Sequence, residues 1–210
     1  MADWQTISSL ATAGGTLVLA VATFTAVRSS IRSARIAEQA LLTGMRPLLV
    51  PSLGDDPVRK VSWSDLHHVQ LGGGRAAFEA EGDVIYLAIG LRNVGAGLAL
   101  VHGWQVIPDL AFGDHPHTEV DDFRRMIIDL YIPQGSPAYW FSAVRDADDP
   151  ARSGLFSALS ERRPFTVDLL YGDQQGGQRT ISRFALRPAG DDAWYSGVSR
   201  HWNLDRPDPR

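Results

Sequence analysis

The sequence of 210 residues contains no cysteine. This absence excludes disulfide bonds, thiolate nucleophiles and cysteine-ligated zinc or iron–sulfur sites. Lysine is nearly absent as well: Lys60 is one of the 20 basic residues, and the other 19 are arginine. The formal net charge is -4, and because residues 1–45 sum to +1, the remainder carries -5. Such a mildly acidic chain lacks the clustered basic residues that bind phosphates, so we expect no nucleic-acid partner.

The common catalytic signatures are also missing. The glycine-containing stretch GLRNVGAG, residues 90–97, is not followed by Lys-Ser or Lys-Thr, and no helix is predicted after it. It is therefore neither a phosphate-binding P-loop nor a dinucleotide-binding fingerprint. The G-x-S-x-G pattern of a nucleophile elbow does not occur. We therefore predict a protein that is not an enzyme and uses no cofactor.

One loop contains residue types that bind metals, GDHPHTEVDD at residues 113–122. The candidate ligands are Asp114, His115, His117 and Glu119. A His-x-His pair on an extended segment places both rings on one face, as zinc ligation requires. Pro116 and the polar neighbours instead indicate a solvated surface loop, and the adjacent His67 and His68 would point in opposite directions. The sequence therefore predicts no metal site, and a metal-dependent enzyme is the weakest alternative.

A long uncharged stretch near the N-terminus is the strongest positive signal. Residues 7–27 carry no charge over 21 positions. A helix of that length spans about 30 Å, which is the thickness of the hydrocarbon core. Asp3 is the one charge before the stretch, so the basic start of a signal peptide is missing. We therefore predict a membrane-spanning anchor in the bilayer, with Trp4 at the outer interface.

The arginines Arg28, Arg32 and Arg35 follow the anchor directly. Positive charge stays on the cytoplasmic side of a membrane. This asymmetry predicts an inner or plasma membrane location, with the N-terminus outside and the main domain in the cytoplasm.

The anchor is rich in small residues, which allow helices to approach closely. The positions expected to pack are Ala11, Gly14, Gly15, Leu17, Leu19 and Phe24. Two interpretations stay open: a helix that packs against copies of itself or a partner protein, and a lone, weakly hydrophobic anchor.

The helix is expected to continue beyond the arginines as a stalk. The apolar positions Phe24, Val27, Ile31, Ala34 and Leu41 repeat in a heptad-like pattern that Glu38 interrupts. Gly44 is typical of a helix end, and Pro47 cannot continue a helix. We therefore predict an anchor and stalk over residues 1–45, with a helix that lies on its own domain as the alternative.

From residue 46 onward, short apolar runs are separated by turn residues. RPLLVPSL, residues 46–53, predicts a first strand at a sheet edge, and further strands flank NVGAG, residues 93–97, and PQGSP, residues 133–137. Alternating residues on both sides of GDQQGG, residues 172–177, predict a hairpin, and residues 151–163 predict a short helix.

This pattern predicts a mainly β protein with an antiparallel β-sandwich in an immunoglobulin-like layout. The β-sandwich domain is expected over residues 46–200, followed by a C-terminal tail over residues 201–210.

An anchor, the dipeptide RP opening a strand, and then LRNVGAGLAL, YIPQGSPAYWF and LLYGDQQGGQ follow one another along the chain. In this order the sequence resembles a loose group of uncharacterised bacterial single-pass membrane proteins with a cytoplasmic β-sandwich domain. The resemblance covers most of the chain and implies the same architecture. Its motifs form turns and strands, so it implies no catalytic residue.

These observations predict a membrane-anchored, non-enzymatic interaction or scaffold module. It would associate with itself through the N-terminal helix or accompany a larger membrane-associated complex. Its partners would be the lipid bilayer and either a partner protein or further copies of the chain. The alternatives are a membrane-tethered ligand-binding or sensor domain and, less favoured, a metal-dependent enzyme that uses the His115/His117 loop.

Overall fold

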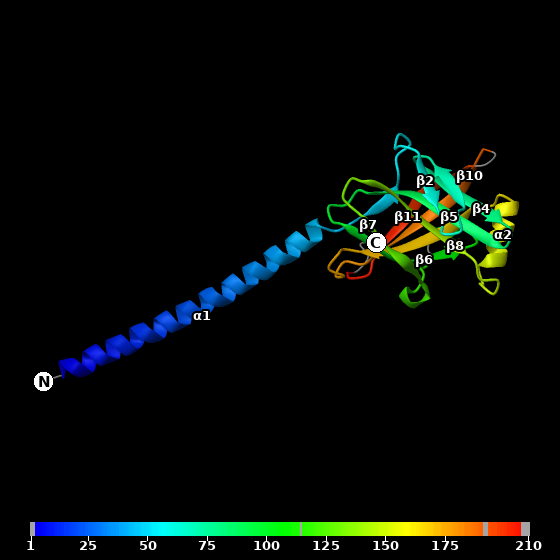
Figure 1. Ribbon diagram of the computed structural model, residues 1–210. Helices are drawn as coiled ribbons and strands as arrows, with labels where there is room; N and C mark the ends of the chain where they lie inside the picture. The colour runs from blue at the N-terminus through cyan, green and yellow to red at the C-terminus, as the bar shows by residue number, and fades with distance from the viewer. Residues whose placement is uncertain (1–2, 114, 191–192, 207–210) are drawn as a thin grey trace. The chain divides into compact units, whose positions relative to one another are not determined.

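The computed structural model describes residues 3–113, 115–190 and 193–206, without the side chains of residues 4–7, 42 and 43. The chain divides into two compact units, Met1–Gly44 and Met45–Arg210 (Figure 1). The expected interfacial position of the Trp4 side chain and the last tail residues, 207–210, lie outside the described part.

The first unit is the helix α1, which runs from Trp4 to Gly44 over 41 residues. No proline or β-strand signal interrupts this stretch, and Pro47 prevents its continuation. The hydroxyls of Thr12, Thr16 and Thr23 each donate a hydrogen bond to the carbonyl four residues earlier. These polar groups are thereby satisfied within the helix itself. The predicted long N-terminal helix is confirmed.

The second unit is mainly β, and strand accounts for 43% of the chain. The strands of the large sheet are β1 (Leu49–Pro51), β4 (Arg75–Glu81), β5 (Val84–Asn93), β6 (Ala99–Ile107), β7 (Arg124–Ile132), β8 (Pro137–Val144), β9 (Phe165–Gly172), β10 (Thr180–Ala189) and β11 (Ala193–Asn203). The remaining elements are the strands β2 (Arg59–Ser62) and β3 (His68–Leu71), the 3-10 turn η1 (Val120–Asp122) and the helix α2 (Arg152–Ser160). The predicted mainly β class is therefore confirmed.

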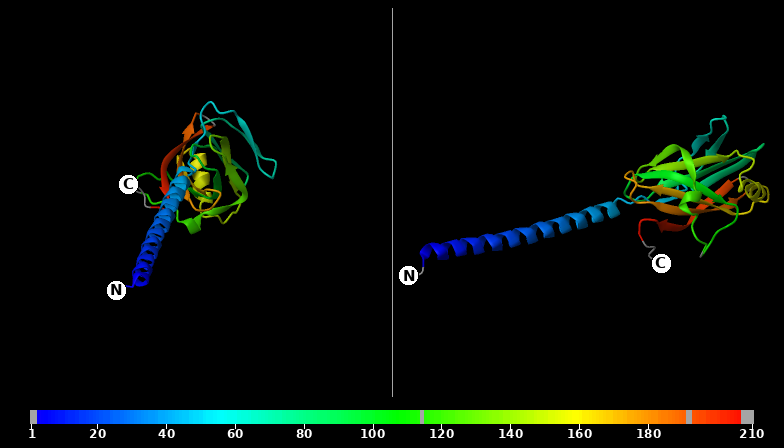
Figure 2. Two further views of the ribbon diagram at one scale, coloured as in Figure 1. Left: turned by 90° about the vertical axis from the view of Figure 1, so that its left-hand side faces the viewer. Right: turned by 90° about the horizontal axis from the view of Figure 1, so that it is seen from below.

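The large sheet has nine antiparallel strands in the order β1-β5-β4-β11-β10-β9-β6-β7, and β8 pairs with β5. Strands β2 and β3 form a separate hairpin. The link between β4 and β11 is short, with Ala76 opposite Trp194 and Arg75 opposite Tyr195. Through this link the strands form one sheet that curls around its core (Figure 2). The immunoglobulin-like layout with two packed sheets is not confirmed.

Two of the predicted turns connect strands that do not pair with each other. After the turn at residues 93–97, β6 pairs with β7 and β9, whereas β5 pairs with β1, β4 and β8. Strands β7 and β8 flank the turn at residues 133–137 but pair with β6 and β5, respectively. The predicted hairpin around residues 172–177 does pair directly, as β9 with β10.

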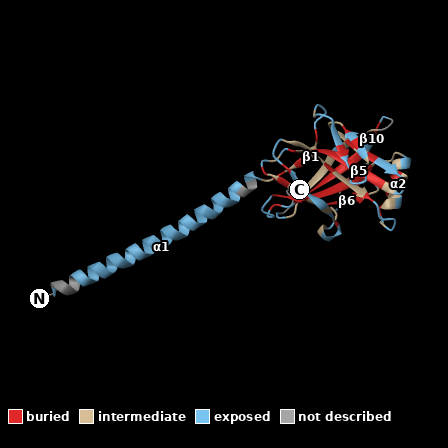
Figure 3. Cartoon of the chain, in the orientation of Figure 1, coloured by how far each residue is buried: buried red, intermediate tan, exposed pale blue. Residues whose placement is uncertain are grey.

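Most of the buried residues lie on the strands of the curled sheet (Figure 3). Aromatic and aliphatic side chains form the core. Its largest fully buried apolar members are Trp140, Tyr171, Phe165, Phe184, Leu49, Ile85, Leu87, Ile89, Leu91, Ile132 and Leu155. Helix α2 contributes Leu155 and Ala158, which are both completely buried. The domain therefore covers most of its apolar side chains by itself.

Asn93 fixes the entrance to the domain. Its side chain is fully buried and uses its complete hydrogen-bonding capacity. Oδ1 accepts from the backbone N–H groups of Leu48 (3.1 Å) and Gly95 (3.0 Å). Nδ2 donates to the carbonyls of Gly97 (2.6 Å) and Ile132 (2.9 Å). The first segment after the helix is thereby tied to the β5–β6 turn and to the end of β7.

The same entrance segment binds the C-terminal part of the domain. Arg46 donates to Asn203 at 2.9 Å and forms an ion pair with Asp205. The backbone N–H of Leu49 donates to the Tyr171 hydroxyl at 3.1 Å, and burial raises the pKa of Tyr171 to about 12. Strand β11 extends to Asn203, so the chain after residue 200 begins as part of the sheet.

Candidate functional sites: the N-terminal helix and a pocket beside the histidine loop

The described large apolar residues of α1 are all exposed. They are Leu10, Leu17, Val18, Leu19, Val21, Phe24, Val27, Ile31, Ile36 and Leu41, with exposed fractions from 49% to 70%. At ~100° per residue, Leu10, Leu17 and Val21 share one side of the helix, whereas Leu19 lies on the opposite side. A helix with apolar residues on all sides is typical of a membrane span or of the centre of a helical bundle.

By length and composition, the segment Ser8–Leu41 qualifies as a membrane span, and its most apolar stretch is not buried. A signal sequence near an N-terminus shares these properties. The structure thus supports one long apolar N-terminal helix that could be either a span or a signal sequence.

The six residues expected to pack do not share one face of α1. Helical geometry places Ala11 and Gly15 on one side, one turn apart, and Leu17 with Phe24 on another side. Leu19 follows Gly15 by four residues and extends the side of Ala11 and Gly15 by one further turn. A Cβ atom built on Gly14 or Gly15 meets nothing within 4 Å. A single helix–helix interface would therefore use a subset, with Ala11 and Gly15 at its closest approach.

Arg28, Arg32 and Arg35 are exposed and lie on one face of α1, because their spacings are four and three residues. Like charges at these spacings destabilise an isolated helix by about 0.2–0.5 kcal/mol per pair. The stripe therefore concentrates positive charge on one face of α1, with Glu38 three residues after Arg35.

The histidine loop, residues 113–122, is held by its backbone. Arg183 on β10 donates to the carbonyls of His115 (3.1 Å) and Pro116 (2.9 Å). Asp168 on β9 accepts from the Thr118 hydroxyl at 2.9 Å and from its backbone N–H at 3.3 Å. Two strands therefore position this loop without using its imidazole rings.

Arg183 and Asp168 form a buried ion pair that was not predicted from the sequence. Two guanidinium nitrogens lie 2.8 Å from the two carboxylate oxygens, and the side chains are 2% and 0% exposed. The two residues stand opposite each other in the register of β9 and β10. Removing one partner of such a pair leaves an uncompensated buried charge, which is strongly destabilising.

The described metal-ligand candidates are not brought together. His115 and Glu119 are exposed, whereas His117 is half-buried, with Nδ1 2.8 Å from the Thr118 carbonyl. The His117 ring packs edge-on against Trp202, with 5.7 Å between ring centroids. Within residues 3–113, 115–190 and 193–206, no group of three or more His, Asp or Glu residues is arranged to hold a metal ion. Asp114 lies outside the described residues.

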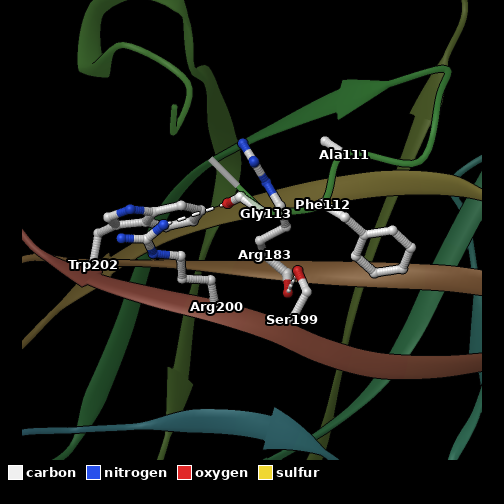
Figure 4. Close-up of a pocket in the computed structure, with 7 residues that line it drawn as sticks. All are labelled: Ala111, Phe112, Gly113, Arg183, Ser199, Arg200 and Trp202. Atoms are coloured by element: carbon white, nitrogen blue, oxygen red, sulfur yellow. Dashed lines mark hydrogen bonds between the residues drawn. The ribbon is translucent and has the colours of Figure 1, made fainter. Parts of the chain in front are cut away.

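An open pocket of about 430 Å³ lies beside the histidine loop (Figure 4). It is lined by Ala111, Phe112, Gly113, Arg183, Ser199, Arg200 and Trp202. The guanidinium carbons of Arg183 and Arg200 lie 4.8 and 5.1 Å from the centroid of the Trp202 ring. Arg200 also donates to the Gly113 carbonyl at 3.4 Å. Asp168 neutralises Arg183, so Arg200 supplies the positive charge of the pocket. Phe112, 44% exposed, supplies its most exposed aromatic ring.

A second polar cluster surrounds His67 and was also missed by sequence reasoning. The His67 ring stacks on Tyr86 with 3.8 Å between centroids, and its Nδ1 lies 2.8 Å from Glu81. Hydrogen bonds donated by Tyr86 and Arg145 lower the pKa of Asp65 to about 2. The Tyr86–Asp65 hydrogen bond in turn raises the pKa of Tyr86. The adjacent His68 is the first residue of β3 and is exposed, whereas His67 precedes the strand.

Comparison with known proteins adds no relative: no protein-family model, curated protein or solved structure matches the chain. What the protein does is therefore inferred from the chemistry of α1 and of the domain surface.

Proposed function

We propose that the protein is a membrane-anchored, non-enzymatic interaction or scaffold module. The observation that carries this proposal is the exposure of the large apolar residues of α1, exemplified by Leu19 at 70%. Apolar surface of this extent is unfavourable in water, and lipid or other helices would cover it. The second unit would be the platform that meets partners, in a β-sandwich-like arrangement of its curled sheet.

The anchor would cross the inner or plasma membrane once, with the N-terminus outside and the domain in the cytoplasm. The arginine stripe at Arg28, Arg32 and Arg35 supports this direction, because Asp3 is the one charge on the other side of the apolar segment. The stripe would lie at the anionic cytoplasmic surface, where basic residues are attracted.

Within the membrane, the helix would associate with copies of itself or with a partner. The Ala11–Gly15 pair supports this step because small residues one turn apart allow two backbones to come close. The described surroundings of Gly14 and Gly15 are open, so leucine at these positions would obstruct association without disturbing the helix.

The experiment that tests the anchor uses the absence of cysteine. Single cysteines are introduced as Ala2→Cys and, in the domain, as Asp109→Cys, whose side chain is 85% exposed. In spheroplasts, a membrane-impermeant maleimide should label A2C directly and D109C after permeabilisation. The protein should also stay in the membrane at alkaline pH. Release at alkaline pH, loss of the N-terminal helix from the mature protein or the reverse labelling would contradict the proposal.

The pocket beside the histidine loop favours a second function, the binding of an organic anion by a membrane-tethered domain. The observation that favours it is the Arg200 guanidinium beside the Trp202 ring in a pocket that the Phe112 ring also lines. Carboxylates and phosphates with an aromatic group should raise the melting temperature of the wild type and not of Arg200→Ala. An equal shift in both proteins, or no shift in either, would contradict this function.

A further inference from the structure

The edge strand β7 contains a large β-bulge, with four residues opposite one. Its pairing with β6 places Leu130 opposite Val101 and Arg125 opposite Gly103. Residues 126–129 therefore stand opposite His102 alone, and the regular ladder is interrupted there. The backbone must leave the line of the strand to accommodate these residues.

The bulge exposes apolar side chains instead of burying them. Ile127 is 99% exposed and Ile128 is 70% exposed, and Tyr131 nearby is 52% exposed. Ile127 exceeds every other exposed large apolar residue in the described part of the domain, including Leu66 at 87%. Two adjacent, highly exposed isoleucines on one strand indicate a contact surface.

We propose that this bulge tip, residues 125–131, contacts the surface of the membrane. Ile127 and Ile128 enter the boundary between headgroups and acyl chains, Tyr131 lies at the interface, and Arg125 meets anionic lipid phosphates. The inference rests on the proposed membrane anchor, since α1 is what keeps the domain close to lipid.

The bulge disfavours an added strand as the occupant. A partner strand needs a regular row of N–H and C=O groups along the edge, and bulges are a common means of protecting edges from such pairing. An apolar phase has no such requirement. The exposed isoleucines thus fit lipid better than a strand from a second copy.

The tip itself carries no net charge, because Asp129 balances Arg125, and it lies in a domain that is acidic overall. The chain after residue 45 carries a net charge of -5, whereas β7 carries Arg124 and Arg125 against Asp129. Arg124 forms an ion pair with Asp149 at 2.7 Å. Arg125 is exposed and forms no ion pair within the described part of the chain. It is therefore free to meet the anionic cytoplasmic leaflet.

The tip is linked through hydrogen bonds to the segment that follows α1. Asn93 ties the domain entrance at Leu48 to Ile132, the last residue of β7. Ile127 is five residues from Ile132, about 17 Å along a strand. A contact that would be weak for a free domain becomes populated when a tether raises its local concentration.

The test uses the full chain, reconstituted in phosphatidylcholine vesicles with and without phosphatidylglycerol. Ile127→Cys carries an environment-sensitive fluorophore, and the lipids carry a nitroxide quencher near the headgroup. The matched control is Leu66→Cys, another highly exposed apolar position, on the turn between β2 and β3. Emission from I127C should shift to shorter wavelength and be quenched, whereas L66C should behave as in water. Arg125→Ala should reduce the equilibrium constant for contact of the tip with anionic vesicles about fivefold.

Flotation with the vesicles separates this inference from the anchor. Protein that does not float contradicts the proposed anchor. Protein that floats, with I127C as unquenched as L66C, overturns the membrane contact alone. Equal quenching at both positions also overturns it, because the contact would then not be specific to the tip. Disulfide-linked dimers of unlabelled I127C, combined with no quenching in the labelled protein, would assign the tip to a second copy and overturn the lipid assignment.

Discussion

The two units of this protein treat apolar side chains in opposite ways. Leu87 in β5 is 0% exposed, whereas Leu19 in α1 is 70% exposed. Burying one such side chain is favourable by about 1.5–3 kcal/mol. The domain obtains this energy from its own fold, and the described residues of α1 do not. The helix therefore leaves a much larger share of its apolar side chains exposed than the domain does.

The two units also differ in how the hydrogen-bonding capacity of their polar groups is satisfied. In the domain, Asn93 and the Arg183–Asp168 pair are buried and satisfied by fixed partners. In α1, the threonine hydroxyls donate to carbonyls of their own helix. The domain is organised by long-range contacts, whereas the helix is satisfied locally and is suited to a surrounding without water.

The largest expected effect on the domain comes from breaking its buried ion pair. Asp168→Ala leaves Arg183 charged and without its carboxylate, so the free energy of unfolding should fall by about 3–5 kcal/mol. Chemical denaturation of the full chain in mild detergent measures this change. Asp109→Ala is the matched control, since Asp109 is 85% exposed and should change stability by less than about 0.5 kcal/mol. Equal effects of the two substitutions would contradict the structural account.

A charge in the middle of the helix separates the two units most sharply. Leu19→Arg should disfavour membrane insertion by about 2.5–3.5 kcal/mol and leave the melting temperature of the domain unchanged. Alkaline extraction measures the membrane-retained fraction. Leu66→Arg, at an exposed apolar position of the domain, should leave retention unchanged. Full retention of the L19R protein would show that α1 is not held by lipid.

The domain entrance should respond less strongly. Asn93→Ala removes four hydrogen bonds and takes the amide donor away from the buried carbonyls of Gly97 and Ile132, at an expected cost of about 1–3 kcal/mol. Thermal unfolding followed by near-ultraviolet circular dichroism measures the loss. Gln134→Ala, at an exposed turn position, should be neutral. An unchanged melting temperature for N93A would mean that the entrance is not fixed as described.

The smallest effect is expected at Asp65 and appears at low pH. The pKa of this carboxyl is lowered from 3.8 to about 2 by hydrogen bonds from Tyr86 and Arg145. A lowered folded-state pKa contributes stability that is present above pH 3.8 and is lost as the pH falls toward 2. The stability difference between wild type and Asp65→Asn should therefore shrink over this range. A difference that stays constant from pH 5 to pH 2 would contradict the assigned pKa.

Sequence patterns located the elements well wherever a local signal dominates. The uncharged run at residues 7–27 lies within the long helix, and Pro47 follows its end. The helix α2 lies within the predicted residues 151–163. Turn residues also located the β9–β10 hairpin. The pairing partners of the strands were harder to predict. The strands on each side of residues 93–97 pair with strands that are distant in the sequence, and no local pattern indicates such partners.

The buried ion pair shows why the pocket could not be predicted. Strand β9 is buried on both faces, so Asp168 does not stand out by alternation of polar and apolar residues. Counting pairs outward from the turn at residues 172–177 would have placed Asp168 opposite Ile181, two residues short of its actual partner Arg183. The burial of both side chains and their hydrogen bonds to the histidine loop depend on long-range packing of the loop against β9 and β10.

The most direct test of the central claim is the native mass of the full-length protein, extracted from its host's membranes in mild detergent. The protein should appear in a species larger than its 22.9 kDa chain, with further copies or a partner. If the species contains only copies of the chain, Gly14→Leu combined with Gly15→Leu should dissociate it. A monomer in the wild type, retained in the membrane and without a co-purifying partner, would contradict the interaction module.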